Sequence, residues 1–170
     1  MRLSLLLVTI LILAACGCAS NKVYVDSLKV QGLGAVVRFP AGSIVPINLK
    51  RVISGSLIEL TNNELASYIG LYVPDINTIP EYARRLNEDL VMDSDIRLEF
   101  DSLERDVKGR LLVYVFMADA RLVNAEIIRA GLAKALIVPP NQKYKQELLA
   151  AEEDARKNKR GIWSDDFNAK

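Results

Sequence analysis

Three patterns of apolar and polar residues follow one another along the chain. The first is a mainly apolar run from Leu3 to Leu13, preceded by a single basic residue, Arg2. The run is shorter than the ~20 residues that a helix needs to cross a bilayer, and it matches the apolar part of a secretory signal peptide. Residues 1–15 are therefore expected to be a signal segment that is removed, and they are set apart from the fold.

The second pattern covers residues 16–34, where small and polar residues alternate irregularly with scattered apolar ones. Such a composition favours a tether rather than a packed element. The third pattern covers residues 35–170, where strand-like and helix-like periodicities recur and where the length suits one ordinary domain. The expected organisation is a signal segment, a tether and a single folded domain.

Within the expected domain, alternating apolar and polar residues predict strands, and apolar residues at four-residue spacing predict helices. The expected strands are residues 36–39, 44–60, 65–74, 95–101 and 110–117, with a tight turn at Ser54-Gly55 that divides residues 44–60 in two. The expected helices are residues 78–92, which begin after Thr78, then residues 122–132 and 144–159. This order indicates an α+β fold in which a small antiparallel barrel carries the helices.

The end of the apolar run, Leu13-Ala14-Ala15-Cys16, resembles the lipobox of bacterial lipoproteins. In those proteins the cysteine becomes the first residue of the mature chain and carries the lipid. The resemblance implies that Cys16 is lipidated and that the membrane is a partner through this lipid. Because Gly17 follows the cysteine, the expected location in the bacterial cell envelope is the outer membrane if the host has one. Otherwise it is the exterior face of the cell membrane.

Charge and composition narrow the expected chemistry. The chain has 22 basic and 21 acidic residues, and removal of Arg2 with the signal segment leaves a neutral protein. Strong nucleic-acid binders usually carry a basic surplus, so nucleic-acid binding without cleavage is not favoured. Its suggestive basic cluster is Lys134, Lys143 and Lys145. The sequence has no histidine, which excludes catalysis or metal binding through imidazole.

Several stretches resemble, in the same order, the staphylococcal nuclease or thermonuclease-like family. They are LEFD…ERDVKGRLLVYVF, LVNAEIIRAGLAKA and PPN…AEEDARKNKRGIW, and the resemblance runs roughly from Leu49 to Asp166. It implies an OB-type, five-stranded antiparallel barrel with about three α-helices. It also implies that Trp163 is a core residue that seals the barrel against the last helix. Active members cleave phosphodiester bonds of DNA or RNA with calcium, a cation that carboxylate oxygens normally hold.

The first expected metal-binding element departs from the family pattern. Active relatives have an acidic D-G-D-T turn between the first strands, and the matching residues here are Ser54-Gly55-Ser56-Leu57. The glycine is kept, and both acids are replaced by serine. A serine hydroxyl brings no negative charge, so this turn is expected to bind calcium poorly.

The next family block, R-L-x-G-I-D-x-P-E, departs in the same direction. Its phosphate-binding arginine is here Ser67, its metal-binding aspartate is Tyr72, and its proposed general base, a glutamate, is Asp75. Asp75 keeps a carboxylate that is one methylene shorter, which is a costly displacement for catalysis. The alternative alignment, on Pro80-Glu81, needs an insertion, and these two residues already fit the start of the helix.

One basic residue of the expected site remains, Arg110 in ERDVKGRLL. Two interpretations are open. Arg110 either clamps a phosphate, or it pairs with Glu104 or Asp106 and fixes the loop; the second is favoured because the other clamping arginine is absent. Apolar residues stand where the family's type member has tyrosines near the nucleotide: Leu136, Ile137 and Val138. The stacking surface of a nucleotide site is therefore not expected.

Taken together, these departures favour a lipoprotein without phosphodiesterase activity, whose domain is a binding or structural module with no cofactor. Its partner in the envelope, a protein or another ligand, is not identified by the sequence. The alternative is a calcium-dependent nuclease with altered ligands, in which Asp75 and Arg110 act with a nearby acid such as Glu59. The two functions differ in whether the chain cleaves nucleic acid when a divalent cation is added.

Overall fold

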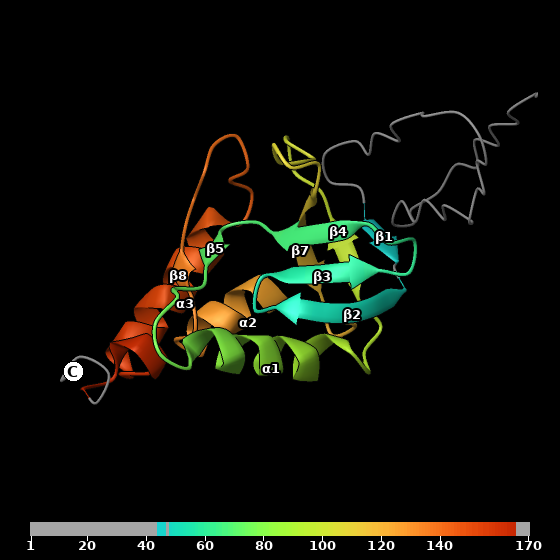
Figure 1. Cartoon of the computed structure of the whole chain (residues 1–170). Coiled ribbons are helices and arrows are strands. Elements are labelled where there is room, and N and C mark those ends of the chain that lie inside the picture. Colours follow the sequence, from blue (N-terminus) through green and yellow to red (C-terminus); the bar gives the residue numbers. More distant parts are fainter. Residues whose placement is uncertain (1–43, 47, 166–170) are drawn as a thin grey trace, which may run out of the picture.

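The computed structural model describes residues 44–46 and 48–165 (Figure 1). In chain order the elements are β1 (Ile44–Pro46), β2 (Leu49–Ser54), β3 (Leu57–Leu60), β4 (Leu65–Tyr68), β5 (Leu71–Tyr72), α1 (Ile79–Val91), β6 (Arg97–Glu99), β7 (Leu111–Phe116), α2 (Val123–Arg129), β8 (Lys134–Ala135), α3 (Lys145–Lys157) and a 3₁₀ turn, Gly161–Trp163. None of the helices in these ranges is long and apolar enough to cross a membrane.

Six strands form one sheet in the order β1-β6-β7-β4-β3-β2, and β5 pairs with β8 in a separate two-stranded ribbon. All neighbours in the large sheet are antiparallel except β4 and β7, which are parallel. Helix α1 runs along the sheet next to β2, as Figure 1 shows. The α+β class and the small, mostly antiparallel OB-type sheet with three helices confirm the expectation. The segment 44–60 forms three strands and not the two expected, because β1 pairs with β6 while β2 pairs with β3.

The core lies around β7, the strand between β6 and β4. Its residues Val113, Tyr114 and Val115 are all fully buried, which explains why LLVYVF is apolar at successive positions instead of alternating. The side chain of Asn124 in α2 is also fully buried. Its Oδ1 accepts a hydrogen bond from the Val115 N–H (2.9 Å), and its Nδ2 donates to the carbonyl oxygen of Ile69 (2.9 Å). Asn124 therefore holds α2 against both parallel strands.

The segment 65–74 is not one strand, as its pattern predicted, because the chain bends at Gly70. This residue has φ of +80°, a conformation that favours glycine, and a Cβ placed there would lie 2.3 Å from Cδ1 of Leu148 in α3. The bend separates β4 from β5 and turns β5 toward β8. The expected strand at residues 36–39 lies outside the described residues.

Two further expectations need correction. Thr78 precedes α1, but its side chain makes no capping hydrogen bond. Trp163 is only half-buried, so it is not a fully enclosed core residue. The guanidinium carbon of Arg156 lies 4.2 Å from the centre of the indole ring, and Nζ of Lys134 lies 5.5 Å from it. The side chains of Arg156 and Lys134 thus cover part of this ring, which the sheet does not enclose.

The glycine of the turn between β2 and β3 generates a test of the packing between this turn and α1. A Cβ at Gly55 would lie 2.4 Å from Cβ of Ala83. Gly55→Ala is therefore expected to lower the free energy of unfolding by about 1–3 kcal/mol through overpacking, as measured by urea denaturation. The double variant Gly55→Ala/Ala83→Gly should recover part of the loss. A Gly55→Ala chain as stable as the parent would show that the turn and the helix are not in contact.

Candidate functional site

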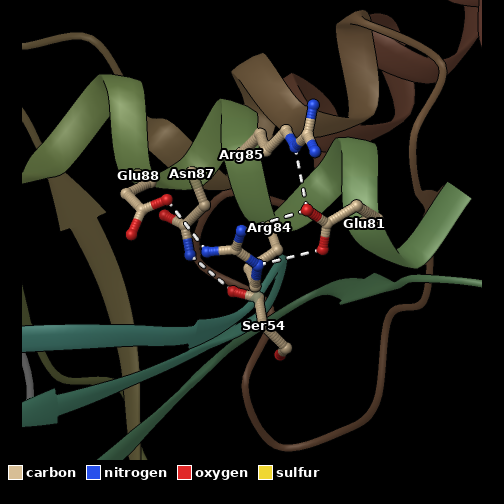
Figure 2. A network of polar contacts seen from close by, with 6 residues as sticks. All are labelled: Ser54, Glu81, Arg84, Arg85, Asn87 and Glu88. Carbon is tan, nitrogen blue, oxygen red and sulfur yellow. Dashed lines mark hydrogen bonds and ion pairs between the residues drawn. The ribbon is translucent and has the colours of Figure 1, made fainter.

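The serine turn between β2 and β3 is fixed to the fold by a buried polar network. Asn87 of α1 donates through Nδ2 to the carbonyl oxygen of Ser54 (2.8 Å), as Figure 2 shows. The hydroxyl of Tyr68 in β4 donates to Oδ1 of Asn87 (2.8 Å), and both residues are buried. The backbone N–H of Tyr68 also donates to the carbonyl oxygen of Ser56 (2.9 Å). Helix α1 and strand β4 therefore set the position of this turn.

The hydroxyl of Ser54 itself takes part in the turn, because its Oγ accepts a hydrogen bond from the N–H of Ser56 (3.2 Å). This is a local side-chain-to-backbone bond of the kind that serine and aspartate form in turns. The hydroxyl thus has a structural role that does not depend on a metal.

On the exposed side of α1, Glu81 is held by two arginines. Arg84 contacts both of its oxygens (3.1 Å each), and Arg85 donates to Oε1 (2.8 Å), while Arg84 also reaches Glu88 (2.9 Å; Figure 2). The hydrogen bonds from Arg84 and then Arg85 lower the pKa of Glu81 to about 2. A carboxylate with so low a pKa is a weak base. Glu81 is therefore a poor substitute for the family's general base, which agrees with the preferred alignment.

The structure brings two of the expected site residues, Ser67 and Arg110, to a single cavity of about 510 Å³. Ser67 lies in β4 opposite Leu112 of β7, and Arg110 immediately precedes β7. The cavity is bounded by β4 and by the loops of residues 103–110 and 136–141. Apolar side chains predominate in its wall, among them Leu71, Leu103, Val107, Leu136 and Val138.

Within this cavity Arg110 is tied to Asp106, as the second interpretation of the sequence proposed. Its Nε and Nη2 both lie 2.6 Å from Oδ2 of Asp106, whose Oδ1 accepts the N–H groups of Lys108 (2.9 Å) and Arg110 (3.0 Å). Burial would raise the pKa of Asp106, but these hydrogen bonds, led by that from the Arg110 side chain, hold it below its usual value. Asp106 is therefore an ionised partner that orients the guanidinium.

The other expected site residues do not line this cavity. Tyr72 lies in β5 opposite Lys134 of β8, and half of its surface is exposed. Asp75 is exposed in the connection between β5 and α1. Ser54 and Ser56 belong to the turn at the far end of β2 and β3 from residue 60. The cavity therefore contains the remnants of the phosphate clamp without the residues that match the metal ligands.

Glu59, the acid named in the nuclease alternative, is also engaged. It is buried, and it accepts hydrogen bonds from Lys50 (2.8 Å) and Arg51 (2.5 Å), which lower its pKa. The lysines suggested as a basic cluster have separate contacts. Lys143 forms an ion pair with the buried Glu99, and Lys134 lies over the ring of Trp163.

Calcium, the ion that the family resemblance implies, does not fit this donor set. The residues matching the family's metal-binding acids are Ser54, Ser56 and Tyr72, whose oxygens are neutral hydroxyls. Within residues 44–46 and 48–165, no group of three or more His, Cys, Asp or Glu side chains is arranged to hold a metal ion.

Sequence reasoning did not identify Asn141, which joins the two loops of the cavity. Its Oδ1 accepts the N–H of Leu103 (2.7 Å), and its Nδ2 donates to the carbonyl oxygen of the same residue (2.8 Å). Asn141 is buried and follows the dipeptide Pro139-Pro140. An asparagine after two prolines indicates a turn, but the pattern gives no sign that its amide would bind a loop 38 residues earlier.

Comparisons with known proteins agree with this fold. The sequence profile described as "Staphylococcal nuclease homologue" matches residues 77–165. The SPbeta prophage-derived endonuclease YokF of Bacillus subtilis (strain 168) is 32% identical over 133 residues, which cover 71% of this chain and 45% of that protein. Endonuclease YncB of the same strain is also 32% identical over 133 residues, with coverage of 71% and 63%.

A thermonuclease of Staphylococcus intermedius is 30% identical over 125 residues, which cover 68% of this chain and 74% of that protein. The match thus spans most of the thermonuclease and less than two thirds of each Bacillus endonuclease.

The pair formed by Asp106 and Arg110 generates a pH-dependent prediction. Because the pKa of Asp106 is lowered in the folded protein, its stabilising contribution is full above the unfolded pKa of about 3.9 and is lost as the pH falls through the lower folded value. Asp106→Asn should therefore be less stable than the parent at pH 7, and the difference should shrink toward pH ~3. Urea denaturation across this range measures it, and a difference independent of pH would contradict the ion pair.

Proposed function

The chain belongs to the staphylococcal nuclease homologue family, and from this premise we propose that it is a membrane-anchored lipoprotein whose thermonuclease-like domain has lost phosphodiesterase activity. The domain then serves as a binding or structural module in the cell envelope. The observation that carries the proposal is the replacement of charged groups at the positions of the family's site. Neutral hydroxyls of Ser54, Ser56 and Tyr72 match its metal-binding acids, and Ser67 matches one arginine of its phosphate clamp.

The electrostatic demand of the reaction supports this proposal. Cleavage of a phosphodiester develops negative charge on the phosphate oxygens, and preorganised cations supply most of the stabilisation. Arg110 is the one matched cation that remains, and its guanidinium is bound by Asp106 at 2.6 Å. A neutralised arginine offers a phosphate less attraction than a free one, and the loss of a single stabilising contact costs about 10²–10³ in rate.

A second candidate is favoured by the names of two relatives, which are endonucleases 32% identical to this chain. It is a calcium-dependent nuclease with altered ligands, acting on DNA or RNA through Asp75 and Arg110. Asp75 is exposed, so its carboxylate is accessible to a cation or to water. This candidate requires a cation site built from residues other than those of the family pattern.

The lipid anchor rests on Leu13-Ala14-Ala15-Cys16, which follows the apolar run directly and lies outside the described residues. Under the proposal, Cys16 carries the lipid and residues 16–34 connect it to the domain. The protein is then held at the cell envelope, in the outer membrane if the host has one and otherwise on the exterior face of the cell membrane.

A nuclease assay separates the two candidates. The chain from residue 22 is incubated with single-stranded DNA or RNA and calcium, at high protein concentration, beside variants Arg110→Ala and Lys108→Ala. Each variant removes one positive charge from the same loop. We expect no cleavage by any of them. Cleavage that Arg110→Ala abolishes and Lys108→Ala preserves would establish a rebuilt active site and would overturn the proposed loss of activity.

The anchor is tested by fractionation of cells that express the full chain. Cys16→Ala should move the protein from the membrane fraction to the soluble fraction, since no thiol remains to accept the lipid. Cys18→Ala is the matched control and should leave the protein with the membranes. Equal membrane retention of the Cys16→Ala chain and the parent would refute the lipid anchor.

A further inference from the structure

We propose that the two loops beside the cavity form a docking surface for the phospholipid bilayer to which the chain is anchored. The loops are residues 103–110 and 136–141, called here the docking loops. The inference rests on the proposed lipid anchor and names the partner of the candidate site. Under this proposal, the apolar side chains that stand where a nucleotide-stacking surface would lie contact the lipid.

Large apolar side chains are exposed in both docking loops. Val107 is fully exposed (103%), and Leu103, Leu136 and Val138 are exposed to 47%, 50% and 59%. All four line the same cavity, so they form one surface and are not scattered singly. A contiguous apolar surface of this kind marks an interaction site on a soluble domain.

The docking loops project on the same side of the sheet, at the top of the view in Figure 1, whereas α1 lies at the bottom. Their conformation is fixed from within. Asn141 binds both backbone polar groups of Leu103, and Asp106 accepts two backbone N–H groups of the turn that carries Val107. These four backbone groups are thus satisfied inside the loops, so they do not need water as a partner where the loops meet an apolar phase.

The described part of the chain begins beside the end of β6 that precedes the first docking loop. Strand β1 is antiparallel to β6, with Ile44 opposite Glu99, and β6 continues directly into the first docking loop. The chain that arrives from Cys16 therefore meets the sheet at the end from which this loop leaves.

The charges at the loops suit a phospholipid interface. Arg105, Lys108 and Arg110 stand among the exposed apolar side chains. Glu64 pairs with Arg105 and Asp106 pairs with Arg110, whereas Lys108 has no ion pair within the described ranges. Lysine and arginine side chains bury their apolar stems at such an interface and place their charges at the level of the phosphates. Apolar insertion together with attraction to anionic lipids is the usual basis of interfacial binding. A bilayer therefore accounts for both kinds of side chain at this surface.

The test uses the full lipidated chain reconstituted in vesicles of phosphatidylethanolamine and phosphatidylglycerol. Variant Val107→Trp places an indole at a loop tip, and variant Tyr82→Trp places one on the exposed side of α1, where Tyr82 is 54% exposed. Lipids brominated near the interface quench indoles that enter the bilayer. The parent chain, with Trp163 alone, gives the background. We expect marked quenching for V107W and none above the background for Y82W.

A second pair of variants tests whether the exposed apolar side chains of the docking loops cause the insertion. Added to V107W, Val138→Asp should shift partition of the loops out of the bilayer by about tenfold, since burial of one such side chain contributes that much. Its quenching should then fall toward the background. Ile76→Asp, an exposed apolar residue outside the docking loops, should leave the quenching of V107W unchanged. Thermal unfolding of each chain confirms that it is folded.

Flotation of the vesicles separates this inference from the proposed anchor. A chain that floats with the lipid while V107W and Y82W are quenched equally, or not at all, keeps the anchor and overturns the docking surface. A chain that does not float refutes the anchor, and unquenched V107W in the same sample would refute the docking surface as well. If Val138→Asp does not reduce the quenching of V107W, the exposed apolar side chains of the docking loops do not cause the insertion, and the proposal is overturned.

Discussion

The arrangement of the site depends on the hydrogen bonds of the Asn124 side chain. This side chain is buried in the core, and its amide binds backbone groups next to β4 and within β7. These two strands form the one parallel pair of the large sheet, which is the pair that an OB-type meander cannot make by a simple hairpin. Ser67 lies in β4 and Arg110 immediately precedes β7, so these bonds help to hold together the two strands beside the cavity that both residues line.

The residues that position the turn between β2 and β3 are not the residues that match the family's metal ligands. The turn Ser54-Gly55-Ser56 is positioned by Asn87, by Tyr68 and by the close approach of Gly55 to Ala83. None of these contacts uses a carboxylate. The conformation of the turn therefore does not depend on acidic side chains at residues 54 and 56.

Most elements of the fold were accessible from local patterns, because the period of apolar residues reports which face of a strand or helix is buried. The break at Gly70 was not accessible, since it depends on Leu148, a residue of α3 that packs against it from far along the chain. Likewise, the sequence left open whether Arg110 pairs with Glu104 or with Asp106, and the loop geometry shows that its partner is Asp106. Trp163 was overestimated as a core residue because composition does not reveal that Arg156 covers its ring.

The hydrogen bond between Ser54 and the N–H of Ser56 has an evolutionary consequence. Aspartate accepts the same kind of bond in turns, so this position can exchange serine and aspartate without a new backbone conformation. Half-buried Ser56 lies beside a glycine whose close packing is independent of it. The same backbone conformation of the turn therefore accepts either serine or aspartate at residue 54. Exchange of serine for aspartate at residue 54 would thus keep this hydrogen bond of the turn.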